Sequence, residues 1–250
     1  MQNEEFLKAE KDYLKLKELL PNDENVLATY NNFLIKKNNH KKNVSGLFKS
    51  VFTNKLYGDQ KLIVKEKWIP SEINPDNPRV FFYIRVGTKS GRRVEIELFK
   101  DRVPKTAENF RSLCTGDNNT ESFNFHYKGS KFHFIDKGNY IVGGDIENND
   151  GSGGYSIYGR HFDDEHFIYP HSQSGVVSMY NKGKDTNASQ FLISLRALPL
   201  FDDKYLVFGK IVLGMDVIWE INQLGTDNNG KPYLDAVIEE CGEILPETVD

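Results

Sequence analysis

Residues 132–145, Phe-His-Phe-Ile-Asp-Lys-Gly-Asn-Tyr-Ile-Val-Gly-Gly-Asp, decide the fold of this chain. Two short strand candidates lie in and around this stretch, over 131–135 and 140–143. Further candidates recur downstream over 175–179, 190–194, 205–211 and 236–240. Many short strands separated by turns are typical of a barrel or a sandwich.

Upstream of this stretch, apolar residues recur at every second position over 80–86 and again over 94–98. This period predicts two half-buried strands, joined by a hairpin over 87–91. A helix is predicted between Pro104, which suits a first helical position, and Gly116, which suits a C-terminal stop. A second helix fits 215–224. Two helices beside many strands predict a mainly β architecture.

Residues 1–78 differ from the rest of the chain in the spacing of their apolar residues. Apolar residues recur at helical spacing over 6–20 and 26–34, and a shorter helix fits 46–57. Three prolines then interrupt 68–79, which favours extended structure and a domain boundary. We predict a helical N-terminal extension with its linker over 1–78 and a barrel domain over 79–246. One pair of helices is no repeat array, so we favour an amphipathic extension that packs on the barrel or on a partner protein.

Composition excludes several classes of protein. The chain has 250 residues, 38% of them hydrophobic, and a net charge of −4, so we expect a globular protein without a broad nucleic-acid-binding surface. The sequence predicts neither a membrane span nor a secretory signal. Cys114 and Cys241 lie far apart, which favours free thiols in a reducing compartment. We expect a cytoplasmic location, with the nucleus as the alternative.

Several motifs together resemble the cyclophilin family over roughly 79–243. They are Val-Pro-Lys-Thr-Ala-Glu-Asn-Phe at 103–110, Tyr-Lys-Gly-Ser at 127–130, Phe-His at 132–133, Gly-Gly-Asp at 143–145, Gly-Ser-Gly-Gly at 151–154, Ser-Ile-Tyr-Gly at 156–159, Phe-Asp-Asp-Glu at 162–165, Ser-Gln-Phe at 189–191 and Val-Phe-Gly-Lys at 207–210. The resemblance implies an eight-stranded antiparallel barrel capped by two helices, and peptidyl-prolyl cis-trans isomerase activity without a metal or cofactor. It implies a proline-containing peptide or protein as the substrate.

The resemblance also implies which residues form the site. The family's catalytic histidine and glutamine are retained as His133 and Gln190. Its catalytic arginine is replaced by Phe134, and the glutamine that orients this arginine is replaced by Val142. The remaining substrate-binding positions correspond to Asn139, Tyr140, Gly151, Tyr180, Asn181, Lys182, Leu192, Leu200, Phe201 and Tyr205.

Most residues of the implied proline pocket differ from those of the family. Asn139 stands where the family has an aromatic wall, and Leu192 where it has a phenylalanine floor. Leu200 and Tyr205 replace a tryptophan and a histidine of the family's cyclosporin site, so we expect weak or no cyclosporin binding. An apolar cleft remains, because Tyr140, Leu192 and Phe201 can still line it.

The lost arginine decides between two functions. Rotation about an X–Pro amide breaks its conjugation, with a barrier of roughly 18–20 kcal/mol, and a donor aimed at the proline nitrogen stabilises the twisted state. Phe134 has no proton to donate, so we expect weak or absent isomerase activity; a fully active isomerase and a purely non-catalytic interaction module are the alternatives. Four cations lie near the implied cleft, although none occupies the arginine's position: Lys137, Arg160, Lys182 and Arg196.

Two further motifs have simple structural interpretations. The glycine-rich run 151–154 lacks the following Lys-Ser/Thr of a phosphate-binding loop, which favours a turn at the rim of the barrel. The acidic run 163–166 corresponds to an acidic loop of the family, and we favour that interpretation over a metal site.

Overall fold

The computed structural model describes Lys15 and residues 65–245. The chain divides into two units after Leu62. Lys15 is helical, and the other helices expected in the N-terminal extension lie outside the described residues.

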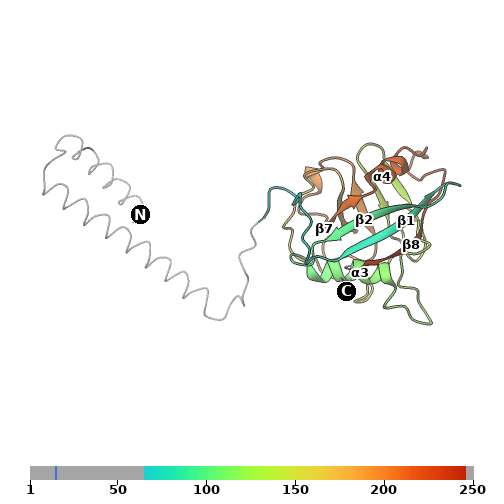
Figure 1. Cartoon of the computed structure of the whole chain (residues 1–250), viewed down its shortest axis with the longest axis horizontal. Helices are drawn as coiled ribbons and strands as arrows, with labels where there is room; N and C mark the ends of the chain where they lie inside the picture. Colours follow the sequence, from blue (N-terminus) through green and yellow to red (C-terminus); the bar gives the residue numbers. More distant parts are fainter. Residues whose placement is uncertain (1–14, 16–64, 246–250) are drawn as a thin grey trace, which may run out of the picture. The chain divides into compact units, whose positions relative to one another are not determined.

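Eight strands form one antiparallel sheet in the order β3-β4-β6-β5-β7-β2-β1-β8. Figure 1 labels four of them, β7, β2, β1 and β8. In the first strand, β1, alternate side chains are fully buried, which confirms the period of two in the sequence. The bounds are β1 Arg79–Val86, β2 Arg92–Leu98, β3 Phe134–Asp136, β4 Tyr140–Gly143, β5 Val176–Met179, β6 Phe191–Ser194, β7 Val207–Leu213 and β8 Ala236–Ile244.

The segment that precedes β3 closes the sheet into a barrel. Gly129 N–H donates to the carbonyl of Ile238 at 2.7 Å, and Phe132 N–H donates to the carbonyl of Ala236 at 2.9 Å. These bonds join the segment to β8, at the opposite edge of the sheet. The strand expected over 131–135 therefore begins later, at Phe134, because residues 129–132 pair with β8. The predicted barrel is confirmed.

Aromatic rings fill the barrel. Phe110 lies at their centre, with its ring centroid 4.8 Å from that of Phe208, 5.0 Å from Tyr127 and 5.2 Å from Phe191. The Tyr127 hydroxyl donates to the carbonyl of Ser189 at 2.7 Å, so its one polar atom is satisfied inside the core.

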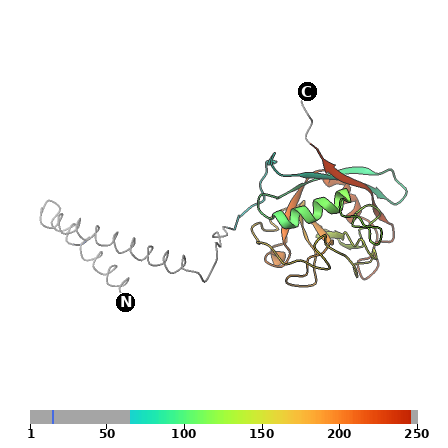
Figure 2. The same cartoon turned by 90° about the horizontal axis from the view of Figure 1, so that it is seen from below.

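The two predicted helices are α3, Pro104–Thr115, and α4, Met215–Asn222. They lie at opposite ends of the barrel (Figure 1), and α3 crosses one of its openings (Figure 2). Helix α3 ends at Gly116, whose φ of +76° suits glycine. Its first turn is capped by Glu165, whose carboxylate accepts from the N–H groups of Lys105 and Thr106 at 3.1 and 2.7 Å. The acidic run thus contributes a helix cap. No helix in the described part of the chain is long and apolar enough to cross a bilayer.

Residues 65–78, which we call the strap, are held against the barrel by a buried ion pair. Lys210 Nζ lies 3.2 Å from Glu97 Oε2, and the two residues face each other across β7 and β2. Lys210 also donates to the carbonyls of Pro70 and Glu72 at 2.7 and 2.6 Å. Glu97 Oε1 accepts from Asn74 N–H and Asn77 Nδ2, both at 3.0 Å. The strap therefore belongs to the folded unit that contains the barrel.

Candidate functional site

The two positions implied for the family's arginine and its orienting glutamine are direct neighbours on the sheet. Phe134 on β3 faces Val142 on β4, and Val142 faces Leu192 on β6. Val142 and Leu192 are fully buried, whereas Phe134 is half-buried. This rung forms an apolar base for the site. The resemblance implies an arginine and a glutamine at the first two of these positions, and here they are the apolar residues Phe134 and Val142.

A glycine turn covers one edge of the Phe134 ring. Ile135 N–H donates to the carbonyl of Gly230 at 2.8 Å, and a Cβ built on Gly230 would lie 2.6 Å from Phe134 Cε2. Asp227 shapes the turn, because its Oδ1 accepts from the N–H groups of Asn229 and Lys231 at 2.8 and 2.9 Å. The position implied for the guanidinium is thus packed between the turn and the sheet.

We expect Gly230→Ala to lower the free energy of unfolding by about 2–4 kcal/mol, because a strained φ and a collision in packed structure each cost about 1–3 kcal/mol. The matched control is Gly138→Ala. Both glycines have positive φ, +80° and +74°, but Gly138 has no neighbouring atom within 4 Å. Urea unfolding of both variants isolates the collision with Phe134. Equal losses would show that the turn does not press on this ring.

Five aromatic residues form a continuous series of ring contacts, which we call the aromatic belt. Adjacent centroids are separated by 5.8, 5.1, 5.0 and 5.5 Å, and every member is half-buried. Burial, followed by the proximity of Tyr180, raises the pKa of Tyr140 to about 12. In order of contact, the belt consists of Phe134, Tyr140, Phe201, Tyr205 and Tyr180.

A buried histidine that the sequence analysis missed supports the belt. His171 Nε2 lies 2.9 Å from Ser178 Oγ, and its Nδ1 lies 3.1 Å from Asp202 Oδ1. Its ring also contacts Phe201 edge to face, with centroids 5.9 Å apart. Phe201 ends the short helix η1, Pro199–Phe201, so His171 fixes this helix relative to β5. Only the three-dimensional arrangement brings these segments together, and no local pattern marks His171.

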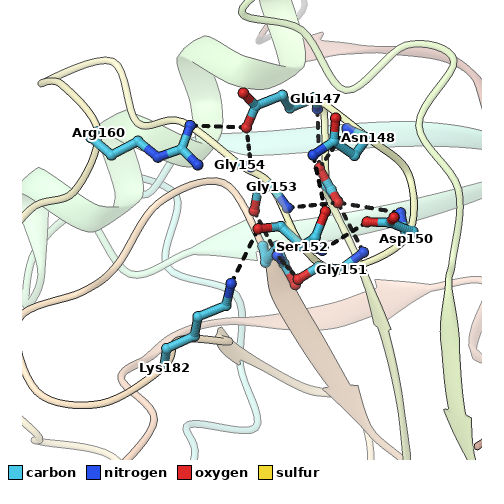
Figure 3. Close-up of polar contacts among 11 residues, drawn as sticks. Glu147, Asn148, Asp150, Gly151, Ser152, Gly153, Gly154, Arg160 and Lys182 are labelled. Carbon is cyan, nitrogen blue, oxygen red and sulfur yellow. Dashed lines mark hydrogen bonds and ion pairs between the residues drawn. The ribbon is translucent and has the colours of Figure 1, made fainter.

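Asp145 organises the glycine-rich loop on the other side of the site. Its buried carboxylate accepts five backbone hydrogen bonds, at 2.8 to 3.2 Å, from residues 147, 148, 150, 151 and 153. Burial alone would raise the pKa of Asp145, but these bonds outweigh it and lower the pKa. Figure 3 shows the loop with Arg160 and Lys182 reaching it. The loop is a rigid rim built around a carboxylate.

The two retained residues, His133 and Gln190, both contact this loop. Gln190 Nε2 donates to the carbonyls of Gly151 and Gly153 at 2.9 and 2.7 Å. A Cβ on Gly151 would lie 2.8 Å from His133 Nε2, so this position needs glycine. Gln190 Oε1 and His133 Nδ1 are buried, and neither has a hydrogen-bond partner among the described residues. Burial lowers the pKa of His133, which favours a neutral ring.

Two hollows flank Tyr180. The larger, of about 620 Å³, is lined by His133, Phe134 and Tyr180 together with Lys131 and Lys231. The smaller, of about 120 Å³, is lined by the glycine loop, Gln190, Tyr180, Arg160 and Lys182. The two hollows share Tyr180 and Gly151, so His133, Phe134 and Gln190 line adjoining parts of one face, which we call the groove.

The candidate replacement cations do not take the arginine's place. Arg160 pairs with Glu147 at 2.9 Å, and Lys182 donates to the carbonyl of Ser152 at 3.1 Å. Lys137 and Arg196 are exposed. Lys231, which the sequence analysis missed, lines the larger hollow beside Phe134 and forms no ion pair with the described residues. Its position depends on the Asp227 turn, which sequence alone did not place near β3.

The other implied positions are dispersed around the groove. Asn139 turns to Asp136, with Nδ2 donating to Oδ1 at 2.9 Å. Asn181 Nδ2 donates to Asn187 Oδ1 at 2.9 Å, in the segment that follows β5. Leu200 is 79% exposed, although its neighbour Phe201 joins the belt.

Most of the barrel domain is similar to known proteins. Residues 82–243 match the family model described as cyclophilin type peptidyl-prolyl cis-trans isomerase/CLD. A curated relative, peptidyl-prolyl cis-trans isomerase cyp11 of Rhizopus delemar, is 45% identical over 172 residues. The match covers 68% of this chain and 51% of the relative, so the chain spans about half of that protein's length.

Proposed function

Because this chain belongs to the cyclophilin family, we propose that it binds proline-containing peptide or protein segments and that its isomerase activity is weak or absent. One observation carries the proposal. Phe134 occupies the position implied for the catalytic guanidinium, packed against Tyr140 at 5.8 Å and against the Gly230 turn. The hydrogen bonds from Gln190 to the glycine-rich loop that Asp145 organises support retained peptide binding.

The expected loss follows from the chemistry of the twisted amide. A hydrogen bond from a charged donor contributes about 1.5–3 kcal/mol, and each 1.4 kcal/mol changes a rate about tenfold. Losing the guanidinium therefore lowers kcat/KM by roughly ten- to a hundred-fold. The apolar Phe134–Val142 pair supplies no substitute donor, and nothing in this step requires a metal or cofactor.

Two measurements on the full chain test this function separately. NMR exchange spectroscopy on a proline peptide measures catalysed isomerisation, and chemical-shift perturbation by the same peptide measures binding. We expect perturbation of residues around Gln190 with little added exchange. Turnover like that of a relative with the arginine intact would refute the loss of activity, and absence of any perturbation would refute peptide binding.

A second candidate is an active isomerase that uses a different cation. Lys231 favours it, because this side chain lines the same hollow as His133 and Phe134. If the chain shows robust turnover, Lys231→Met decides the question. Loss of turnover in this variant, with peptide binding retained, would assign the donor to Lys231. The control is Lys128→Met, a change at another exposed lysine outside both hollows.

We expect Phe134→Arg alone to restore little activity, less than about threefold. The Gly230 turn occupies the space beside residue 134, and Val142 cannot orient a guanidinium because it has no polar atom. The triple variant Phe134→Arg/Val142→Gln/Asn139→Phe should gain more, since it also restores the orienting amide and the aromatic wall. The exchange measurement above compares them. Substantial rescue by the single change would show that the rest of the pocket is functional.

We expect cyclosporin to bind weakly, with a dissociation constant above about 10 μM, equivalent to less than roughly 7 kcal/mol. The implied contact positions are Leu200, which lies 79% exposed, and Tyr205, which packs against Phe201 and Tyr180 within the belt. Isothermal titration of the drug into the full chain measures this. Nanomolar binding would contradict the assignment of these two positions.

We also propose that residues 1–78 provide a surface for a protein partner and that the chain acts in the cytoplasm or nucleus. The amphipathic periods over 6–20 and 26–34 support the first proposal. Affinity capture with the full chain, compared with a variant whose apolar positions at Val26, Tyr30 and Phe33 are changed to serine, tests it. Equal capture by both would count against the extension as an interface.

A further inference from the structure

The aromatic belt offers faces that this chain does not use itself. Its five rings are half-buried and touch one another with centroids 5.0–5.8 Å apart. No cation among the described residues lies over any of them, whereas Arg93, Lys105 and Arg160 cover rings elsewhere. The exposed parts of these half-buried rings therefore remain available to a ligand.

Three members of the belt also carry hydroxyl groups that have no hydrogen-bond partner within residues 65–245. No residue of the described part forms a hydrogen bond with the hydroxyl of Tyr140, Tyr180 or Tyr205. Burial raises the pKa of Tyr140 to about 12 and also raises that of Tyr205, so the hydroxyls of these two residues remain donors at neutral pH. A ligand that suits the belt therefore combines apolar rings with exposed hydrogen-bond acceptors.

A polyproline II segment has this combination. It makes no internal hydrogen bonds, so its carbonyl groups need outside donors, and it repeats every three residues with a rise of about 9 Å. Adjacent belt centroids are 5.0–5.8 Å apart, so two rings separated by a third are at most about 11 Å apart, a limit that admits the rise of about 9 Å. Aromatic grooves recognise proline-rich segments in this way because the ligand is already extended.

The smaller hollow, at the Tyr180 end of the belt, adds a preference for charge. Arg160, His161 and Lys182 line it, and none of its lining residues is a carboxylate. Glu147 offsets Arg160 from outside the lining. Lys182 donates to the carbonyl of Ser152 and forms no ion pair with the described residues, although it also lines a neighbouring hollow with Asp164 and Asp185. An acidic side chain beside the proline-rich segment complements this end.

We propose that the aromatic belt binds a proline-rich segment in the polyproline II conformation, with an acidic residue placed at Lys182 and Arg160. This inference rests on the proposed function and narrows its ligand from any proline-containing peptide to a segment with several prolines. In this proposal the aromatic belt contacts several proline rings, whereas the pocket implied by the family holds one.

Isothermal titration of the full chain with three synthetic peptides tests the proposal. The first is a short polyproline peptide flanked by glutamate, the second has the same length and charge but a single proline among alanines, and the third is polyproline flanked by lysine. We expect the first to bind about tenfold more tightly than either of the others. Equal binding of the first two would overturn the inference and leave the proposed function standing. If none of them binds, both fail. Preference for lysine would overturn the assigned charge.

Variants locate the binding surface. Tyr180→Ala removes a ring and should weaken the first peptide about tenfold, while Tyr180→Phe removes only a hydroxyl and should weaken it less. Tyr83→Ala, on β1 and outside the belt, should leave binding unchanged. Lys182→Glu should reverse the preference between glutamate and lysine flanks. Unchanged affinity in both Tyr180 variants would exclude the belt as the binding surface.

Discussion

Asp145→Ala should lower the free energy of unfolding by more than about 3 kcal/mol and abolish peptide binding. The Asp145 carboxylate is fully buried and accepts five backbone hydrogen bonds from the glycine-rich loop. Each buried donor left without a partner costs about 1–3 kcal/mol, although water entering the loop recovers part of this. Urea unfolding measures the loss. Peptide titration below the transition reports whether the loop still forms its rim.

The control for this prediction is Asp150→Ala. Asp150 lies in the same loop and accepts from Ser152 N–H at 2.8 Å, but its side chain is exposed, so we expect a loss below about 1 kcal/mol. The pH dependence has a definite sign. The pKa of Asp145 is lowered in the folded state, so its stabilisation is present above the unfolded value of about 3.9 and is lost as the pH falls through the folded value. Similar losses in both variants would refute the central role of Asp145.

Lys210→Met should cost about 3–5 kcal/mol of stability, the usual effect of leaving a buried charge without its partner. Glu97 is 1% exposed and Lys210 is 5% exposed, so water cannot replace the missing ammonium group. The change also removes the donor to the carbonyls of Pro70 and Glu72. We therefore expect the strap to become sensitive to protease at denaturant concentrations where the barrel remains folded.

The double variant Lys210→Met/Glu97→Gln separates the ion pair from the strap. It removes both charges and leaves an amide able to bond Asn74 and Asn77, so it should be more stable than Lys210→Met alone. Protease cleavage in the strap should persist, because the carbonyls of Pro70 and Glu72 still lack their donor. Full protection of the strap in either variant would show that Lys210 does not hold it.

Sequence patterns predicted the parts of this structure that depend on local chemistry. Alternation over 80–86 gave β1, and Pro104 with Gly116 gave the two ends of α3. These inferences succeed because a period or a cap can be recognised without knowing what lies nearby. The resemblance to the cyclophilin family, not a local pattern, assigned Phe134 to the arginine position, and the loss of a proton donor there stays a prediction.

Features that depend on distant contacts could not be predicted in this way. Residues 129–132 look like the start of β3, but they pair with β8. The Gly230 turn covers Phe134, although the two lie far apart in sequence. In the sequence, His171 looks like an ordinary polar residue and Lys210 like a lysine within a strand. Only the fold shows that His171 supports Phe201 and that Lys210 holds the strap. The belt combines both kinds of information, since its residues were named singly and their contacts were not foreseen.

The pairing of residues 129–132 with β8 has a consequence for synthesis on the ribosome. Strand β8 also pairs with β1 along almost its whole length. The pairing of β8 with β1 and its pairing with residues 129–132 therefore cannot form until residues 236–244 have left the exit tunnel. Until then the nascent chain exposes two unpaired edges, which are prone to aggregation. At about 5–20 residues per second, the more than a hundred residues from 132 onwards take several seconds to emerge, and in that interval chaperones have access to the unfinished domain.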